Sequence, residues 1–138
     1  MNFMTDLERI FLDSNILVYL VGQDELKGEK VRHILKPEMI ISTQVIIENV
    51  NACLKKLKLT KDSSFAHGQM LQSNFKVVTI TTDIISLSFF LSKKYQLSLW
   101  DSLIVATALH NKCDTLYSED MQNGLVIEQA LTIKNPFK

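Results

Sequence analysis

The sequence predicts an α/β protein: a three-layer α/β/α sandwich with a central, mostly parallel sheet of about five strands. Short apolar runs alternate with longer amphipathic segments along the whole chain, which favours parallel strands joined by crossover helices. The connecting segments are short, and this suits right-handed crossovers. Only 4 Gly and 2 Pro among 138 residues leave little room for linkers, so we expect a single domain over residues 1–138.

The first third of the chain is expected to hold one strand and two helices. The apolar run at 10–12 is typical of a buried strand, and Ser14 or Asn15 follows as a candidate cap for a short helix over 16–20. A second helix must end before Pro37, because the residue before a proline disfavours helical backbone. Its apolar stripe comprises Leu26, Val31, Ile34 and Leu35.

The middle of the chain is expected to hold a second strand and two further helices. The run at 39–41 predicts the strand, and Ser42 or Thr43 is the candidate cap of the helix that follows. A second helix is expected from about 62 to 75. The first of these helices has a buried face with i, i+4 spacing, formed by Val45, Ile46, Val50, Cys53, Leu54 and Leu57.

The last third of the chain is expected to hold three strands and two helices. The β-branched run at 77–80 is the clearest strand by composition. A helix opens at Thr81 or Thr82, and a strongly apolar helix is expected over 98–110. The apolar side chains of the first helix are expected to be mostly core, with part of them as an alternative partner surface; they are Ile84, Ile85, Leu87, Phe89 and Leu91. The closing strands are expected at 115–117 and 131–133.

Composition narrows the class of protein. Fifteen Lys and Arg balance fifteen Asp and Glu, which excludes a strongly basic nucleic-acid coat protein and an acidic disordered tail, but not a local nucleic-acid site. Cys53 and Cys113 lie far apart without metal-ligand spacing, and we expect two buried thiols. Residues 1–8 do not resemble a signal peptide, and no apolar run approaches the ~20 residues of a membrane helix. A soluble, cytoplasmic protein without a membrane partner is therefore expected.

Four acidic residues stand where a sheet of this kind binds ligands, near the carboxyl ends of strands or the starts of helices. Asp13 follows the first strand and Asp120 follows the strand at 115–117, whereas Glu48 and Asp101 lie early in helices among apolar residues. Carboxylates gathered at one pole repel one another unless a cation neutralises them. An all-oxygen site suits Mg²⁺ or Mn²⁺ rather than Zn²⁺, and it points to phosphodiester hydrolysis.

Three segments carry a resemblance to a known family. They are FLDSNIL at 11–17, LWDSLIVA at 99–106 and LYSEDMQNG at 116–124. In this order, with acids at 13, 48, 101 and 120, they resemble the PIN domain family, and most of all the toxin ribonucleases of bacterial VapBC-type toxin–antitoxin pairs. The likeness spans nearly the whole chain, to the closing residues 133–137.

The resemblance implies a metal-dependent endoribonuclease that hydrolyses RNA by in-line attack of water, with the 3′-oxygen as leaving group and one or two Mg²⁺ or Mn²⁺ ions. It also implies a cognate antitoxin and a homodimer. The acids that match the family's catalytic and metal-binding residues are Asp13, Glu48, Asp101 and Asp120. Asn15 would hold Asp13 or a water beside it, and Ser118 would support the cluster by hydrogen bonding. Glu119 is expected to point away from the cluster.

Other residues and other functions are also compatible with parts of this sequence. Lys55 lies two turns after Glu48 on one helical face, where it could meet an RNA phosphate, although a solvated lysine at the helix end explains it more simply. Trp100 is predicted to be a core anchor rather than a platform for base stacking. His67 and the other two histidines are predicted to be surface or helix-end residues. The alternatives are a catalytically weak PIN-fold module for RNA binding or protein interaction, and a receiver-like phospho-acceptor domain. A receiver would need an adjacent acidic pair after the first strand, where Asp13 stands alone.

Overall fold

The computed structural model describes residues 8–138 of the chain. Its six strands form one sheet in the order β3-β2-β1-β4-β6-β5, in which only β5 pairs antiparallel with its neighbour. The strands are β1 (Ile10–Leu12), β2 (Ile40–Ser42), β3 (Lys76–Val78), β4 (Thr115–Tyr117), β5 (Val126–Ile127) and β6 (Leu131–Lys134). The expectation for residues 1–8 falls, apart from Glu8, outside the described residues.

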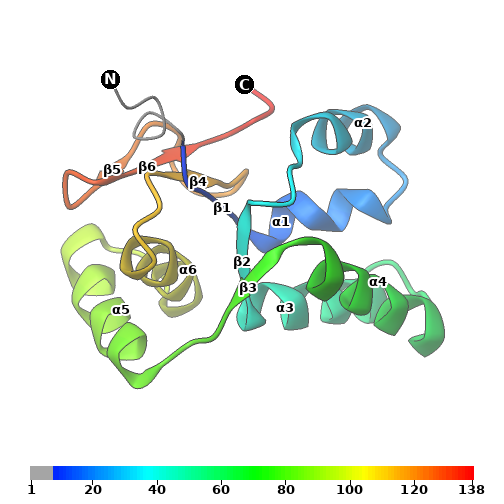
Figure 1. The fold of residues 1–138 in the computed structure, drawn as a ribbon, viewed down its shortest axis with the longest axis horizontal. Helices are drawn as coiled ribbons and strands as arrows, with labels where there is room; N and C mark the ends of the chain where they lie inside the picture. The colour runs from blue at the N-terminus through cyan, green and yellow to red at the C-terminus, as the bar shows by residue number, and fades with distance from the viewer. Residues whose placement is uncertain (1–7) are drawn as a thin grey trace.

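Helices connect the parallel strands and cover both faces of the sheet. They are α1 (Ser14–Leu17), the 3₁₀ turn η2 (Val18–Leu20), α2 (Glu25–Ile34), α3 (Thr43–Lys55), α4 (Lys61–Asn74), α5 (Thr82–Tyr95) and α6 (Leu99–His110). Figure 1 shows α5 and α6 side by side on one side of the sheet, with α1 to α4 on the other. This arrangement confirms the expected α/β fold with a mostly parallel sheet.

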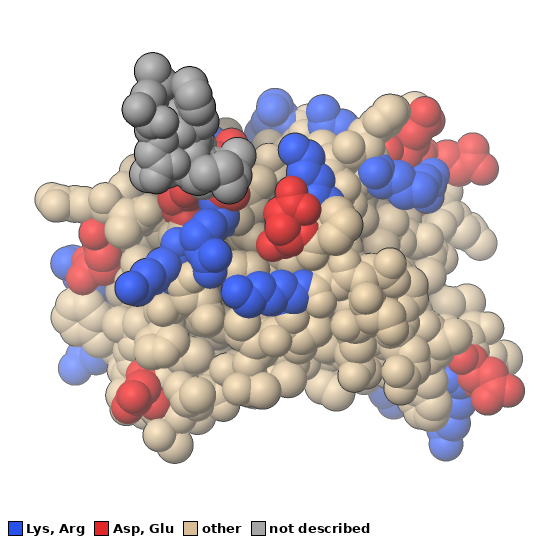
Figure 2. All heavy atoms as spheres, in the orientation of Figure 1, with Lys and Arg blue, Asp and Glu red and all other residues tan. Residues whose placement is uncertain are grey.

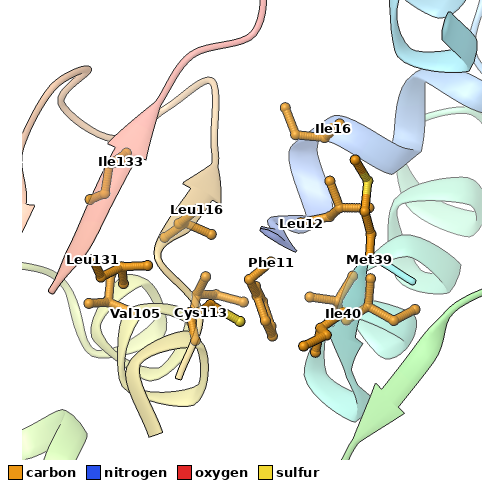
Figure 3. Packing of buried hydrophobic residues seen from close by; sticks show 14 of the residues in the cluster. Phe11, Leu12, Ile16, Met39, Ile40, Val105, Cys113, Leu116, Leu131 and Ile133 are labelled. Carbon is orange, nitrogen blue, oxygen red and sulfur yellow. The ribbon is translucent and has the colours of Figure 1, made fainter. Parts of the chain in front are cut away.

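The core lies between these layers and follows from the apolar runs of the strands. Phe11, Leu12 and Leu116 are fully buried at the centre of the sheet, with Ile40 and Val105 packed beside them (Figure 3). Because these strands are covered on both faces, each of them reads as a continuous apolar run rather than an alternating one. The two cysteines are free and buried, as expected.

Helix starts follow local capping chemistry. The side chains of Ser42, Thr60, Thr81 and Ser98 each accept a hydrogen bond from a backbone N–H in the first turn of the helix that follows. The short helix α1 differs from expectation, because its cap is Asp13 rather than Ser14 or Asn15. Asp13 is therefore fixed at the junction between β1 and α1.

Several side chains depart from the sequence-based predictions. Leu26 is 84% exposed, although it falls in the predicted apolar stripe of α2. Phe89 and Ile85 lie on the outer side of α5 and are exposed, whereas Ile84 and Leu91 are buried as expected. Helix α5 packs through one face only, and its remaining apolar side chains therefore face solvent.

The sheet also has one strand more than expected. Strand β5 is only two residues long, and a turn with positive φ at Glu128 and Gln129 connects it to β6. Such turns usually carry Asn-Gly, so the sequence gives no hairpin signal here. Among the described residues no helix is both long enough and apolar enough to cross a membrane.

Candidate active site

A pocket of about 550 Å³ opens where β1 and β4 end at their carboxyl ends. The four predicted acids all line this pocket: Asp13, Glu48, Asp101 and Asp120. They come from four separate elements, since one follows β1, one lies in α3, one lies in the first turn of α6 and one follows β4. The topology thus brings together side chains that the sequence separates by up to 107 positions, as the numbers 13 and 120 show.

Asp13 is the most buried of the four acids, with 4% of its surface exposed. Its Oδ1 accepts a hydrogen bond from the backbone N–H of Ser14 at 2.7 Å, and its Oδ2 accepts one from the Ser118 hydroxyl at 2.8 Å. Burial raises the pKa of Asp13 to about 6, and the negative charges of Asp101 and Glu48 add to the rise. The hydrogen bonds from Ser118 and Ser14 lower this pKa, and so they offset part of the rise.

Asn15 links two of the acids. Its amide Nδ2 lies 3.2 Å from Asp13 Oδ2 and 3.2 Å from Asp120 Oδ2, and donates to both. Its Oδ1 accepts a hydrogen bond from the backbone N–H of Glu119 at 3.1 Å, which sets the orientation of the amide. Asn15 therefore has the geometry expected of a residue that holds Asp13, and it also holds the loop after β4.

Asp101 and Glu48 form the opposite part of the cluster. The backbone N–H of Asp101 donates to the Ser98 hydroxyl at 3.1 Å, so Asp101 serves in the helix cap and faces the pocket at the same time. Burial raises the pKa of Asp101, as do the charges of Asp120 and Glu48. Like charges thus act on one another across the cluster, and no Lys or Arg of the described residues forms an ion pair with any of the four acids.

Two supporting residues were missed by the sequence analysis. The Ser14 hydroxyl donates to Glu48 Oε1 at 2.7 Å, and Gln44 Nε2 donates to Glu48 Oε2 at 3.1 Å. Gln44 precedes Glu48 by four positions, so the helical spacing alone could have indicated this contact. The role of Ser14 depends on the approach of α1 to α3, which no local pattern reveals.

A buried polar chain behind the site was also missed. Asn49 Nδ2 donates to the backbone oxygen of Ser14 at 3.2 Å, and Asn49 Oδ1 lies 3.0 Å from His67 Nε2. The prediction that His67 is a surface or helix-end residue is wrong, because only 4% of it is exposed and it lies in the middle of α4. Its place on α4 faces α3, and the buried Asn49 supplies the polar partner that a core histidine needs.

Two lysines and a tryptophan also line the pocket. Lys55 and Lys56 lie on the pocket wall at the end of α3, as the helical spacing from Glu48 predicts for Lys55. Trp100 is 62% exposed and also lines the pocket, so the prediction of a core anchor is wrong. It lies in the first turn of α6 and points outward, whereas Ser102 and Ile104 of the same helix are buried.

The donor chemistry of the site is all oxygen. Within residues 8–138, no three Asp, Glu, His or Cys side chains lie close enough together to form a ready-made metal cage. Hydrogen-bonding side chains from Ser14 and Asn15 stand between the carboxylates. Side-chain oxygens of this kind are the donors that hard divalent cations such as Mg²⁺ prefer.

Comparisons with known proteins agree with this architecture. A family model described as PIN domain matches residues 10–122. A toxin–antitoxin complex from Klebsiella pneumoniae contains a chain 24% identical to this one, with 92% of this chain and 97% of that chain covered and a TM-score of 0.68. A comparison with curated proteins finds no match.

Two further solved structures have the same fold. One is a DNA-bound VapBC from Salmonella typhimurium, with 17% identity, 94% and 99% coverage of this chain and that one, and a TM-score of 0.70. The other is VapC20 of Mycobacterium tuberculosis, described as a Sarcin-Ricin loop cleaving toxin, with 15% identity, 80% and 89% coverage and a TM-score of 0.68. Identities this low establish a shared fold alone.

Proposed function

The chain belongs to the PIN domain family, and from that premise we propose that it is a metal-dependent endoribonuclease, the toxin of a toxin–antitoxin pair. One observation carries the proposal. Four carboxylates that form no ion pair within residues 8–138 line a single pocket, and one of them is almost fully buried. Such a concentration of negative charge destabilises the folded state unless a cation neutralises it. Clusters of this kind are common at functional sites, where the charge is needed for binding or catalysis.

The residues fit a hard divalent cation, Mg²⁺ or Mn²⁺. Asp13, Glu48, Asp101 and Asp120 would hold it directly or through water, because the site offers oxygen donors and no His or Cys. When bound, the cation supplies Lewis-acid chemistry: it lowers the pKa of water and neutralises charge on a phosphodiester. The cation-free pKa of Asp13, about 6, leaves this carboxylate ionised at neutral pH.

The chain's own residues orient the site and position the substrate. Asn15 and Ser118 hold the Asp13 carboxylate from one side, and Asn15 holds Asp120 as well. Lys55 and Lys56 are the basic side chains on the pocket wall, and they would contact RNA phosphates next to the scissile bond. On the face seen in Figure 2, acidic and basic side chains are interspersed, so that face offers no broad basic surface for RNA.

We also infer a cognate antitoxin, a homodimer and a cytoplasmic location. The antitoxin is supported by the relatives of the same fold, which were solved as a toxin–antitoxin complex and as a DNA-bound VapBC. A bound antitoxin would inhibit the ribonuclease and so protect the RNA of the cell that produces it. The homodimer and the location rest on the family resemblance.

The test is RNA cleavage by the purified protein with Mg²⁺ or Mn²⁺. Asp101→Ala should lower the cleavage rate by about 100-fold or more, because it removes a group that contacts the reacting centre. Asp83→Ala is the matched control, since Asp83 is also an acid in the first turn of a helix but lies outside the pocket. Unfolding by urea should show that both variants are folded, and EDTA should abolish wild-type cleavage.

Two results would overturn the proposal. One is cleavage by Asp101→Ala at the wild-type rate, which would mean that the activity comes from elsewhere or from a contaminant. The other is undiminished cleavage by the wild type in EDTA, which would exclude the proposed divalent cation.

A further inference from the structure

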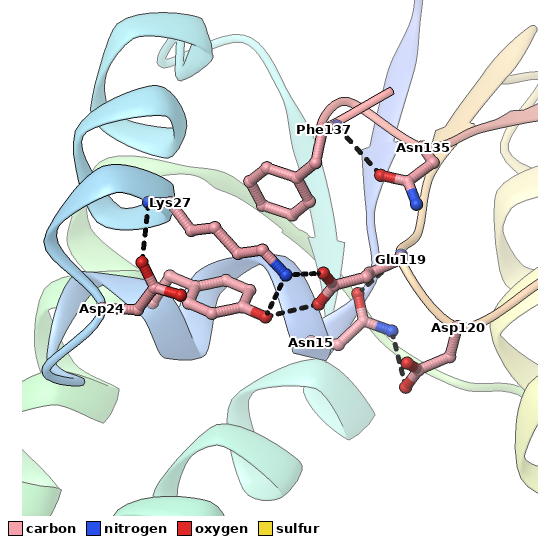
Figure 4. Close-up of polar contacts among 8 residues, drawn as sticks. Asn15, Asp24, Lys27, Glu119, Asp120, Asn135 and Phe137 are labelled. Atoms are coloured by element: carbon pink, nitrogen blue, oxygen red, sulfur yellow. Dashed lines mark hydrogen bonds and ion pairs between the residues drawn. The ribbon is translucent and has the colours of Figure 1, made fainter.

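A fifth carboxylate borders the acidic pocket, but it is engaged elsewhere. Glu119 lies beside Asp120 in the loop after β4, and its side chain turns toward Lys27 of α2 and Tyr19 of η2 (Figure 4). Lys27 Nζ forms an ion pair with Glu119 Oε2, and the Tyr19 hydroxyl donates to Glu119 Oε1. The expectation that Glu119 points away from the four acids is confirmed, although Glu119 still lines the pocket.

The lysine of this cluster is held in place by aromatic rings. Lys27 Nζ lies 5.3 Å from the ring centroid of Tyr19 and 5.1 Å from that of Phe137. The two rings meet edge to face, with centroids 5.4 Å apart. An ammonium group over an aromatic ring is attracted to it electrostatically. Two rings and one carboxylate thus place the positive charge of Lys27 beside Glu119.

The cluster connects to the acids through hydrogen bonds of one loop. The backbone N–H of Glu119 donates to Asn15 Oδ1, and Asn15 Nδ2 donates to Asp120 (Figure 4). The same Nδ2 also donates to Asp13. The side chain of Glu119 thus points to one side of the loop, and its backbone supports the acidic cluster on the other. If Lys27 were absent, nothing else that the structure shows would neutralise the Glu119 carboxylate.

We infer that Lys27 is a positioning residue: it withdraws Glu119 from the cation site and so limits that site to four carboxylates. This inference rests on the proposed function, because it presumes that the acidic pocket binds a divalent cation. Without the ion pair, Glu119 adds its full charge to the pocket, and the cation should bind more tightly. Without Glu119, the unpaired Lys27 should repel the cation, and binding should weaken.

The chain contains a matched control for this cluster. Lys94 and Tyr95 of α5 contact Glu128, with Lys94 Nζ 2.6 Å and the Tyr95 hydroxyl 2.7 Å from Glu128 Oε2. The same three residue types therefore form a similar cluster at the turn between β5 and β6, although here both donors contact one carboxylate oxygen. None of these three residues lines the acidic pocket.

The experiment is Mn²⁺ binding without RNA, measured from the electron paramagnetic resonance signal of free Mn²⁺. Lys27→Met keeps the length of the side chain against Phe137 but removes its charge, and we expect about three- to tenfold tighter binding. Glu119→Gln should weaken binding by a similar factor, and the double variant should return near the wild-type affinity. Lys27→Arg should keep that affinity, and Lys94→Met should not change it.

The pattern of signs separates this role from a structural one. If the ion pair only stabilised the loop, each single variant would weaken binding, and the double variant would weaken it about as much as either single variant does. Equal affinities of wild type and Lys27→Met, or weaker binding by Lys27→Met than by wild type, would overturn the inference and leave the proposed function standing. A wild type that binds no Mn²⁺ would overturn both.

Discussion

Asp13→Asn should make the cation-free protein more stable at alkaline pH, although it removes a residue of the proposed active site. The wild-type carboxylate is buried, and its pKa of about 6 lies above the ordinary value of 3.8. The folded state therefore holds this proton more strongly than the unfolded state does. The stability that this provides is fully present below pH 3.8 and is lost as the pH rises through 6.

The magnitude follows from the size of this shift. A difference of about two pKa units corresponds to about 3 kcal/mol of destabilisation at pH 8 by the ionised group. Asparagine has no charge, but its amide would place a donor against Asn15 Nδ2, which now donates to Asp13 Oδ2. The loss of that hydrogen bond costs about 1 kcal/mol, so we expect a net gain of about 1–2 kcal/mol at pH 8. At pH 4.5 the gain should be about 2 kcal/mol smaller, and so close to zero.

The assay is urea unfolding of both proteins in EDTA at pH 4.5 and pH 8. Asp83→Asn is the control, because Asp83 is an exposed acid in the first turn of α5 and should show no such dependence on pH. Adding Mg²⁺ at pH 8 should favour the wild type, since the variant loses a ligand of the proposed site. A difference in unfolding free energy between Asp13→Asn and wild type that is the same at both pH values would refute the reasoning.

Two further variants test the packing of α3 against α4 by urea unfolding. Gly68→Ala should lower the unfolding free energy by about 1–3 kcal/mol, because the added Cβ would lie 2.7 Å from Val50 Cγ2. Gly22→Ala is the control: a Cβ there has only ordinary contacts, so this variant should change the unfolding free energy little. A Gly68→Ala protein as stable as wild type would show that the two helices are loosely packed. Asn49→Ala should cost about 1–3 kcal/mol, since it leaves His67 Nε2 without its buried partner, and an unchanged free energy would show that this contact contributes nothing.

Much of the fold could be predicted from the sequence because the signals are local. Strands β1 and β4 fall where the apolar runs predict them, and strands β2 and β3 are displaced by one or two residues. The caps Ser42, Thr81 and Ser98 were each among the predicted helix starts. Burial on both faces of the sheet and side-chain capping are each encoded within a few neighbouring residues.

Predictions failed where a side chain's environment depends on distant elements. Trp100 was predicted to be buried and is exposed, and His67 was predicted to be exposed and is buried. An apolar pattern shows which residues can be buried, but not which face of a helix packs against another element. Strand β5 was missed because its turn is formed by Glu128 and Gln129 rather than by glycine. Contacts from Tyr95 on α5 hold that turn in place.

By itself, the sequence determined the alternation of strands and helices and the family to which the chain belongs. It also determined the positions of the four acids, which follow strands or lie early in helices. Only the tertiary structure decided which carboxylates face the pocket without an ion pair to a basic side chain and which one, Glu119, is paired with a lysine. Asp120 meets Asn15 across 105 positions of the chain, and Glu119, its neighbour, meets Lys27 across 92. The physical reason is that a charge is neutralised by whatever lies within a few ångströms of it, and the packing of whole elements sets those neighbours.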